Sequence, residues 1–306
     1  MKRTTKIPVT IITGFLGAGK TTFINTLLKQ NPETQFALVE NEFGEVAIDT
    51  KLIKGVEASR MFELKQGCIC CTITDEYELV LQELAERFPN VERLLIETTG
   101  VADPAPVVQP FLKYGDLKEI YQYNGTVCLV DAANYEAQPE EEIRIKQQVI
   151  SDLILVNKSE NLSEIRKIDL HKKIKSINPF ARIEFVEYGN VIGLQLNNIQ
   201  SAIKSKYNFI TYNSPHIHIQ SKFFSYQEPL NKEKFIDWMS YTLDIHKNQI
   251  YRTKGILCFQ EEPFEYILQG VGGKFELEEG EFILDKTESE LVFIGKLENV
   301  NLEFNP

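Results

Sequence analysis

The stretch that most constrains what this chain can fold into is Gly14-Phe15-Leu16-Gly17-Ala18-Gly19-Lys20-Thr21-Thr22. It matches the phosphate-binding loop pattern G-x-x-x-x-G-K-[ST] at every specified position. The apolar, β-branched run over residues 7–12 predicts a strand before it, and residues 23–29 have the apolar spacing of a helix after it. Strand, glycine-rich loop and helix are the context in which this motif holds the phosphates of a nucleotide.

The physics of such a loop gives each residue type a role. Glycines let the backbone curl so that successive N–H groups surround phosphate oxygens, and the helix dipole adds positive charge at the same place. Lys20 would reach the β- and γ-phosphates, and the hydroxyl of Thr21 would bind Mg²⁺. The predicted nucleotide contacts of this loop are Gly14, Gly17, Ala18, Gly19, Lys20, Thr21 and Thr22.

Composition narrows the class of protein. The 306 residues are enough for two domains, each with its own core. A net charge of −11, from 33 basic and 44 acidic residues, argues against nucleic acid as the main partner. The chain has no apolar run long enough to span a membrane, and its basic N-terminus leads directly into the first predicted strand rather than into a signal peptide. We therefore expect a cytoplasmic protein that binds neither nucleic acid nor membrane.

Strand and helix patterns alternate from residue 7 to about residue 187, which predicts a parallel sheet covered by helices on both faces. After a predicted strand over residues 35–40, the chain becomes rich in carboxylates. Ligands of open parallel sheets sit at the carboxyl ends of the strands, so this segment would lie near the phosphate-binding loop. Taken alone, it is equally consistent with a solvated acidic loop. Its acidic residues include Glu40, Glu42, Glu45 and Asp49.

A cluster of thiols follows, at Cys68, Cys70 and Cys71. Thiols this close suit a divalent ion such as Zn²⁺, which takes four ligands in a tetrahedron. In an extended segment Cys68 and Cys70 would share one face and Cys71 the other, so convergence of all three requires a turn. Two or three of them would then bind, with a carboxylate or water completing the shell. Small buried core residues and a redox pair are the alternatives.

Two further strands end in residues typical of nucleotide chemistry. The strand over residues 91–97 ends in Glu97, with Gly100 three residues on. Glu97 would hold a metal-bound water or orient the attacking one, and the N–H of Gly100 could bind the γ-phosphate, unless the strand merely ends in a turn. The strand over residues 152–156 leads into Asn157, Lys158 and Glu160. Asn-Lys-x-acid is the guanine-recognition pattern of GTPases, in which the usual acid is Asp. The extra methylene of Glu160 is either absorbed by a shifted loop or weakens the choice of guanine over adenine.

Together these motifs resemble the CobW-type GTPases, relatives of the nickel chaperones that serve urease and hydrogenase. The resemblance covers nearly the whole chain, and the C-x-C-C element is its most specific part. It implies a GTP-hydrolysing metallochaperone that passes a metal to a client metalloprotein, with Zn²⁺ the usual cargo and Co²⁺ in the vitamin-synthesis branch. It also implies a role for Asp49 with Mg²⁺. The implied metal ligands are Cys68, Cys70 and Cys71 with the carboxylates of Glu40 and Glu45.

The C-terminal part predicts a smaller α+β domain, with one of its strands around Gly255 to Phe259. This domain resembles the C-terminal domain of the same family. We therefore expect an α/β protein with a P-loop NTPase domain over residues 1–200, built on a mainly parallel sheet, and a second domain over residues 214–306. His216 and His218 are expected to be exposed polar residues rather than ligands. A homodimer is compatible with the sequence, which does not fix the oligomeric state.

The order of the motifs suggests a two-state switch, because the acidic segment lies between the phosphate-binding loop and the thiols. The γ-phosphate would order residues 40–49 against the thiols, and hydrolysis would loosen the metal site. Two other functions stay open. A metal sensor would use the nucleotide only structurally, and a small-molecule kinase would need an acceptor site and leaves the thiols without a role.

Overall fold

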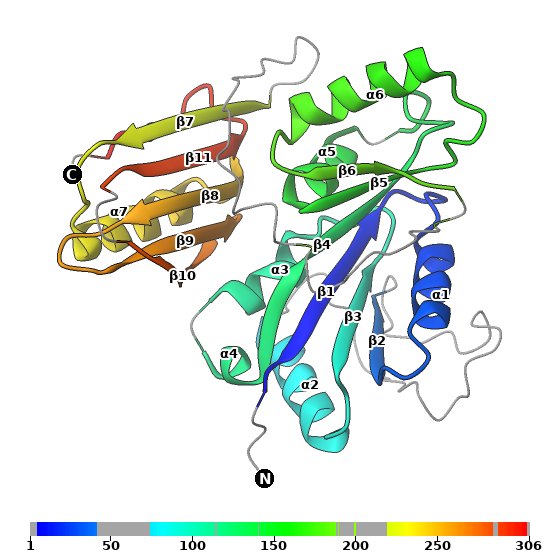
Figure 1. Cartoon of the computed structure of the whole chain (residues 1–306), viewed down its shortest axis with the longest axis horizontal. Coiled ribbons are helices and arrows are strands. Elements are labelled where there is room, and N and C mark those ends of the chain that lie inside the picture. Colours follow the sequence, from blue (N-terminus) through cyan, green and yellow to red (C-terminus); the bar gives the residue numbers. More distant parts are fainter. Residues whose placement is uncertain are drawn as a thin grey trace. The chain divides into compact units, whose positions relative to one another are not determined.

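The computed structural model describes residues 5–41, 74–113, 115–139, 141–187, 189, 199, 219–283 and 287–304, without the side chains of residues 40, 41 and 74–76. The chain forms two compact units. One contains a six-stranded sheet and the other a five-stranded sheet. Figure 1 shows the strands and helices along the chain.

The sheet of the first unit is entirely parallel, with strand order β2-β3-β1-β4-β5-β6. Its strands are β1 (Ile7–Gly14), β2 (Phe36–Asn41), β3 (Arg93–Thr98), β4 (Tyr121–Asp131), β5 (Leu153–Asn157) and β6 (Arg182–Phe185). The helices along this part of the chain are α1 (Lys20–Gln30), α2 (Thr74–Arg87), α3 (Ala105–Leu112), α4 (Asp116–Ile120), α5 (Glu141–Ile150) and α6 (Glu164–Ile177).

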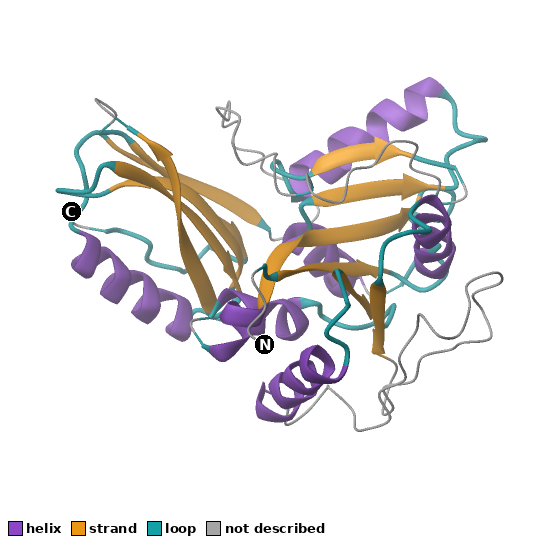
Figure 2. Cartoon of the chain, turned by 60° about the horizontal axis from the view of Figure 1, so that its bottom comes forward, coloured by secondary structure: helices purple, strands orange, loops and turns teal. Residues whose placement is uncertain are grey.

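The central strands β1, β4 and β5 are buried on both faces, so their apolar residues supply two cores. Alternate residues of a strand point to opposite faces, and β4 shows the division. Val127 and Leu129 pack in the core that contains α1, whereas Cys128 and Val130 pack in the core that contains Leu170 and Ile174 of α6. Helices therefore cover both faces of the sheet, which confirms the predicted α/β architecture (Figures 1 and 2).

The parallel arrangement determines where chemistry can occur. All six strands point the same way, so their carboxyl ends meet at one edge of the sheet. The register pairs Glu40 with Glu97 on β2 and β3, and Asp131 with Asn157 on β4 and β5. The glycine-rich loop leaves β1 at this same edge.

The second unit pairs one helix with an antiparallel sheet of strand order β10-β9-β8-β11-β7. Its elements are β7 (Gln220–Tyr226), α7 (Lys232–Ile245), β8 (Ile250–Cys258), β9 (Phe264–Val271), β10 (Lys274–Phe282) and β11 (Ser289–Gly295). Helix α7 lies along one face of the sheet (Figure 2) and buries Phe235, Met239 and Leu243 in the shared core. The side chain of Asn231 accepts a hydrogen bond from the N–H of Lys234, which caps the start of this helix.

Strand β8 begins earlier than its apolar pattern indicates. The sequence predicts a strand only from Gly255, whereas the structure extends it back to Ile250. The added part contains Arg252 and Lys254, which are both buried. Buried charged residues break the apolar alternation on which a sequence-based prediction depends, and this is why the boundary was missed.

Candidate nucleotide-binding site

The glycine-rich loop packs tightly against two neighbouring strands. Gly14 ends β1 with φ +136°, and a Cβ there would lie 2.3 Å from the carbonyl oxygen of Leu129 in β4. Gly19 precedes α1 with φ +103°, and a Cβ there would lie 2.4 Å from the side-chain nitrogen of Asn157. Only glycine fits both the backbone conformation and the space at these positions. The loop is therefore held in a fixed curl at the carboxyl edge of the sheet.

Lys20 is the first residue of α1, and its side chain turns back across the loop. Its ammonium donates a hydrogen bond of 3.0 Å to the carbonyl oxygen of Gly14, and the residue is buried. Burial lowers the pKa of Lys20, whereas the nearby Glu97 and Cys128 act to raise it. The predicted phosphate-binding lysine and the predicted catalytic acid thus lie within electrostatic reach of each other. Thr21 is partly buried and Thr22 exposed in the first turn of the helix.

The end of β3 is joined to the loop by two contacts. The hydroxyl of Thr98 donates a hydrogen bond of 2.9 Å to that of Thr13, and both residues are buried. Gly100 passes so close to the loop that a Cβ there would lie 2.6 Å from the backbone nitrogen of Leu16. The structure therefore brings the predicted residues Glu97 and Gly100 to the phosphate-binding loop.

The segment after β3 is also anchored from α5. The side-chain amide of Gln147, which is fully buried, donates hydrogen bonds of 3.1 Å and 3.2 Å to the carbonyl oxygens of Gly100 and Ala102. The hydroxyl of Thr99, in contrast, is buried with no hydrogen-bond partner in the part of the chain that the structure describes. An unsatisfied buried hydroxyl is costly, so its presence between Glu97 and Gly100 fits a site that takes a water, a phosphate oxygen or a metal ligand.

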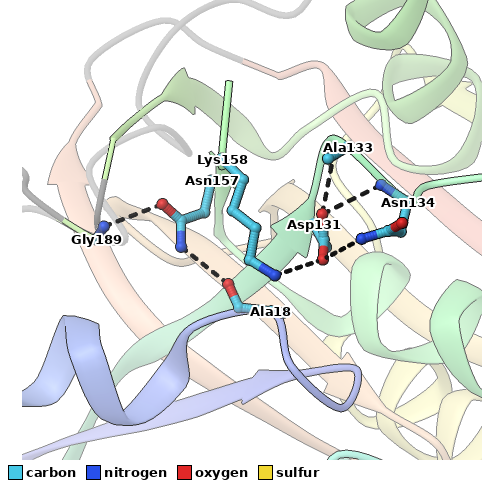
Figure 3. Close-up of polar contacts among 7 residues, drawn as sticks. All are labelled: Ala18, Asp131, Ala133, Asn134, Asn157, Lys158 and Gly189. Carbon is cyan, nitrogen blue, oxygen red and sulfur yellow. Dashed lines mark hydrogen bonds and ion pairs between the residues drawn. The ribbon is translucent and has the colours of Figure 1, made fainter. Parts of the chain in front are cut away.

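The Asn-Lys-x-Glu segment after β5 holds the loop from the other side. The side-chain amide of Asn157 donates a hydrogen bond of 3.0 Å to the carbonyl oxygen of Ala18, and its own oxygen accepts one of 3.0 Å from the N–H of Gly189. Lys158 forms an ion pair of 2.7 Å with Asp131 (Figure 3). Glu160 is exposed. Of the three predicted base-recognition residues, Asn157 thus bonds directly to the phosphate-binding loop, and Lys158 and Glu160 follow it in the chain.

The predicted metal ligands fall largely outside the described residues. Cys68, Cys70, Cys71 and Glu45 do so. Asp49, expected to act with Mg²⁺, and the two histidines expected to be exposed rather than ligands, His216 and His218, also lie outside the described residues. The backbone of Glu40 is described within β2 but its side chain is not. Within the described ranges, no group of three or more His, Cys, Asp or Glu side chains could hold a metal. Cys128 is buried in the core, as expected for a residue in a buried strand.

The structure adds residues that the motif analysis did not assign to the site: Asp131, Gln147, Thr13 and Thr98. The sequence pattern could have indicated Asp131 as a site residue, because an acid at the carboxyl end of a buried parallel strand lies at the ligand edge of such a sheet. No sequence pattern pointed to Gln147, since a glutamine in a helix has no characteristic spacing from a loop more than 40 residues earlier.

The fold, the curled loop and the buried lysine define a phosphate-loop nucleotide-binding protein. Residues 8–185 match the family described as CobW/HypB/UreG, nucleotide-binding domain. Residues 219–303 match the cobalamin synthesis protein cobW C-terminal domain. The chain therefore belongs to the CobW/HypB/UreG family, which confirms the resemblance predicted from its motifs.

Several known proteins are similar to the chain along nearly its whole length. The zinc chaperone YjiA of Escherichia coli (strain K12) is 33% identical over 304 residues, with 94% of each chain covered. The zinc-regulated GTPase metalloprotein activator 1 of Schizosaccharomyces pombe is 27% identical, with 95% of this chain and 82% of the relative covered. The crystal structure of Zn(II)-bound YjiA GTPase from E. coli matches with a TM-score of 0.67 at 30% identity, covering 95% of this chain and 94% of that one. No helix among the described residues is long and apolar enough to cross a membrane.

Proposed function

We propose that the protein is a GTP-hydrolysing metallochaperone, which binds zinc at its C-x-C-C segment and couples GTP binding and hydrolysis to transfer of the metal to a client protein. The predicted enzyme class, a GTPase, is confirmed by its relatives. The proposal goes further than that class, because it names the metal-binding segment, the coupling and the client transfer.

The pairing of β2 with β3 supports the proposed coupling between the nucleotide site and the metal site. Strand β2 pairs in parallel with β3, with Glu40 opposite Glu97 and Asn41 opposite Thr98. The thiol-bearing segment, residues 42–73, follows directly from this end of β2. The end of β2, from which this segment continues in the sequence, therefore lies beside the end of β3, which contains Glu97 and leads to Gly100. A change at the γ-phosphate position can act on the start of that segment across a single strand spacing.

Each nucleotide-site residue has a role in this proposal. The ammonium of Lys20 neutralises charge on the β- and γ-phosphates, and the N–H of Gly100 binds the γ-phosphate. Thr21 and Glu97, with Asp49, offer the oxygen ligands that Mg²⁺ prefers, and the ion would supply further positive charge at the phosphates. Attack of water on the γ-phosphorus then releases phosphate and leaves GDP.

The metal site of the proposal consists of Cys68, Cys70 and Cys71 with the carboxylates of Glu40 and Glu45. Thiolates favour Zn²⁺ over harder ions, and the order of intrinsic affinities places Co²⁺ below Zn²⁺ at such a site. Zinc is therefore the expected cargo, and Co²⁺ a weaker competitor for the same ligands. The names of the relatives, zinc chaperone and zinc-regulated activator, support the same metal.

The test is a Zn²⁺ competition titration of the fully reduced protein against a chromophoric chelator, with Mg²⁺ and either a non-hydrolysable GTP analogue or GDP. We expect one thiol-dependent site whose affinity rises about 5–150-fold with the GTP analogue, the usual range of allosteric coupling. The double variant Cys70→Ser, Cys71→Ser should lose this site, whereas Cys258→Ser, which changes a buried thiol of the second unit, should keep it.

Other outcomes identify the alternatives. Equal zinc affinity with both nucleotides would contradict the switch and favour a metal sensor with a structural nucleotide. Thiol-independent binding would remove the cysteines from the site. A strict requirement for an added acceptor before phosphate is released from GTP would indicate a kinase.

A further inference from the structure

The ion pair between Asp131 and Lys158 lies at the predicted base-binding end of the nucleotide site. Asp131 is the last residue of β4, and Lys158 directly follows β5, so the parallel register brings them to the same edge. The ammonium of Lys158 lies 2.7 Å from Oδ2 of Asp131. Figure 3 shows this ammonium pointing to the carboxylate.

Asp131 is held rigidly in this position. Its Oδ1 accepts hydrogen bonds from the N–H groups of Ala133, at 3.0 Å, and Asn134, at 3.2 Å. Its Oδ2 accepts a third, of 3.0 Å, from the side chain of Asn134. Only 3% of the residue is exposed. The carboxylate is therefore a fixed acceptor, set by the turn that follows its own strand.

Lys158 pairs with this acceptor from an unusual backbone conformation. Its φ of 60° lies in the left-handed region, which a residue other than glycine adopts at a cost of about 1–2 kcal/mol. About 40% of its side chain is exposed although its charged end is paired with a buried group. The methylene stem of the lysine is thus accessible while its ammonium is anchored.

Glu160 shows what this anchoring achieves. The residue is exposed, and within the described part of the chain its carboxylate has no hydrogen-bond or ion-pair partner. It stands two residues from Lys158, the nearest cation along the chain, and Glu is one methylene longer than the usual Asp. A lysine without its anchor could therefore pair with Glu160 and remove the carboxylate that recognises guanine.

We propose that Asp131 is a positioning residue for base recognition: it holds the ammonium of Lys158, so that the lysine stem stacks on the purine and Glu160 remains free to bind guanine. This rests on the proposed use of GTP. Asp131 therefore sets the preference for guanine over adenine without touching the base. The guanine-specific contact is made by Glu160, which accepts hydrogen bonds from N1 and the exocyclic amine.

The experiment measures displacement of a fluorescent GDP derivative by GDP, ADP and pyrophosphate, with Mg²⁺ present and zinc removed by a selective chelator. Asp131→Asn keeps the shape of the side chain but not its charge. We expect GDP affinity to fall about tenfold, the size of one charge-assisted hydrogen bond, with a smaller change for ADP and none for pyrophosphate. The matched control is Glu136→Gln, which removes a carboxylate paired with Arg166 and Lys173 on the surface and should change none of the three affinities.

A second pair of variants separates positioning from a general structural role. Once Glu160→Gln has removed the competing charge, adding Asp131→Asn should not lower the GDP-to-ADP ratio further. Lys158→Met keeps the stem and removes the ammonium that Asp131 holds. If Asp131 acts through that ammonium, adding Asp131→Asn to Lys158→Met should not change the GDP-to-ADP ratio further. The double variant has no unpaired charge at this position, so this test stands even where Asp131→Asn alone does not fold. Equal losses for GDP, ADP and pyrophosphate in Asp131→Asn, or a further loss of the ratio when Asp131→Asn is added to Lys158→Met, would overturn the proposal.

Failure of the proposed function and failure of this inference give different results. A wild-type protein that prefers GDP over ADP but shows no thiol-dependent zinc site would contradict the metallochaperone and leave this inference intact. A wild-type protein that does not bind the GDP derivative would overturn the use of GTP and, with it, the role of Asp131.

Discussion

The side-chain amide of Gln147 donates a hydrogen bond of 3.1 Å to the carbonyl oxygen of Gly100, and thereby joins α5 to the residue that we expect to contact the γ-phosphate. The same amide also bonds the carbonyl oxygen of Ala102. Gly100 lies against the backbone of Leu16 in the phosphate-binding loop. The segment after β3 is thus fixed from both sides, which is what a preorganised site for a phosphoryl transition state requires.

Gln147→Met should lower kcat for GTP hydrolysis about tenfold or more and leave the affinity for GDP unchanged. The substitution leaves two buried carbonyl oxygens without their donor, at about 1–3 kcal/mol each, and frees the Gly100 segment to move. Single-turnover hydrolysis and GDP displacement measure the two effects.

The neighbouring residue provides the control for this variant. Gln148 is also buried in α5, but its side chain bonds the hydroxyl of Tyr135, away from the Gly100 segment. Gln148→Met should therefore lower stability and leave kcat near the wild-type value. Equal kcat values for the two variants would show that Gln147 has only a structural role.

Two glycines of the loop should respond differently to alanine. Gly14→Ala places a Cβ 2.3 Å from a backbone oxygen and keeps an unfavourable φ of +136°, so we expect a loss of roughly 3 kcal/mol or more in the free energy of unfolding. Gly17→Ala meets no atom within 4 Å and carries only the cost of its φ of +74°, about 1 kcal/mol. Urea unfolding of both variants tests the difference. Similar losses would mean that contact with β4 does not hold the loop.

The sequence predicted those parts of the molecule that depend on local patterns. The loop from Gly14 to Thr22 could be recognised because its chemistry needs fixed residue types at fixed spacing. The parallel sheet followed from buried strands that alternate with helices. Gln147 and the pair of Thr13 and Thr98 could not be recognised, because their partners are distant in the chain. The start of β8 was missed because charged residues are buried within it.

Chemical labelling should divide the five cysteines of the chain into two groups. Cys128 and Cys258 are buried, and burial raises the pKa of Cys128 to about 12, so its thiol stays protonated and unreactive at neutral pH. We expect a thiol reagent to modify Cys68, Cys70 and Cys71 in the native protein, and all five after denaturation. Zn²⁺ should protect those three in proportion to its binding. Rapid labelling of Cys128 without denaturation, detected by peptide mass analysis, would contradict its burial.

The pair of Asp131 and Lys158 should contribute to stability in a way that depends on pH. Burial acts to raise the pKa of Asp131, but hydrogen bonds from Lys158 and Asn134 outweigh it and hold the pKa below its usual value of 3.8. As the pH falls below that value, the unfolded chain takes up a proton before the folded one does. Stability is therefore lost through this window, and the contribution is complete at higher pH.

The measurement compares the free energy of unfolding of the wild type with that of Asp131→Asn between pH 2 and pH 7. We expect the free energy of unfolding of the wild type to exceed that of Asp131→Asn by a constant amount above about pH 5. This excess should decrease steadily as the pH falls below 3.8. Salt separates this pair, whose carboxylate is buried, from a surface pair. Glu136 is exposed, and its ion pairs with Lys173 and Arg166 are screened at about 1 M salt. The effect of Glu136→Gln should vanish there, whereas most of the Asp131 effect should persist. A difference for Asp131→Asn that does not change with pH would show that its carboxylate does not stabilise the folded protein through its charge.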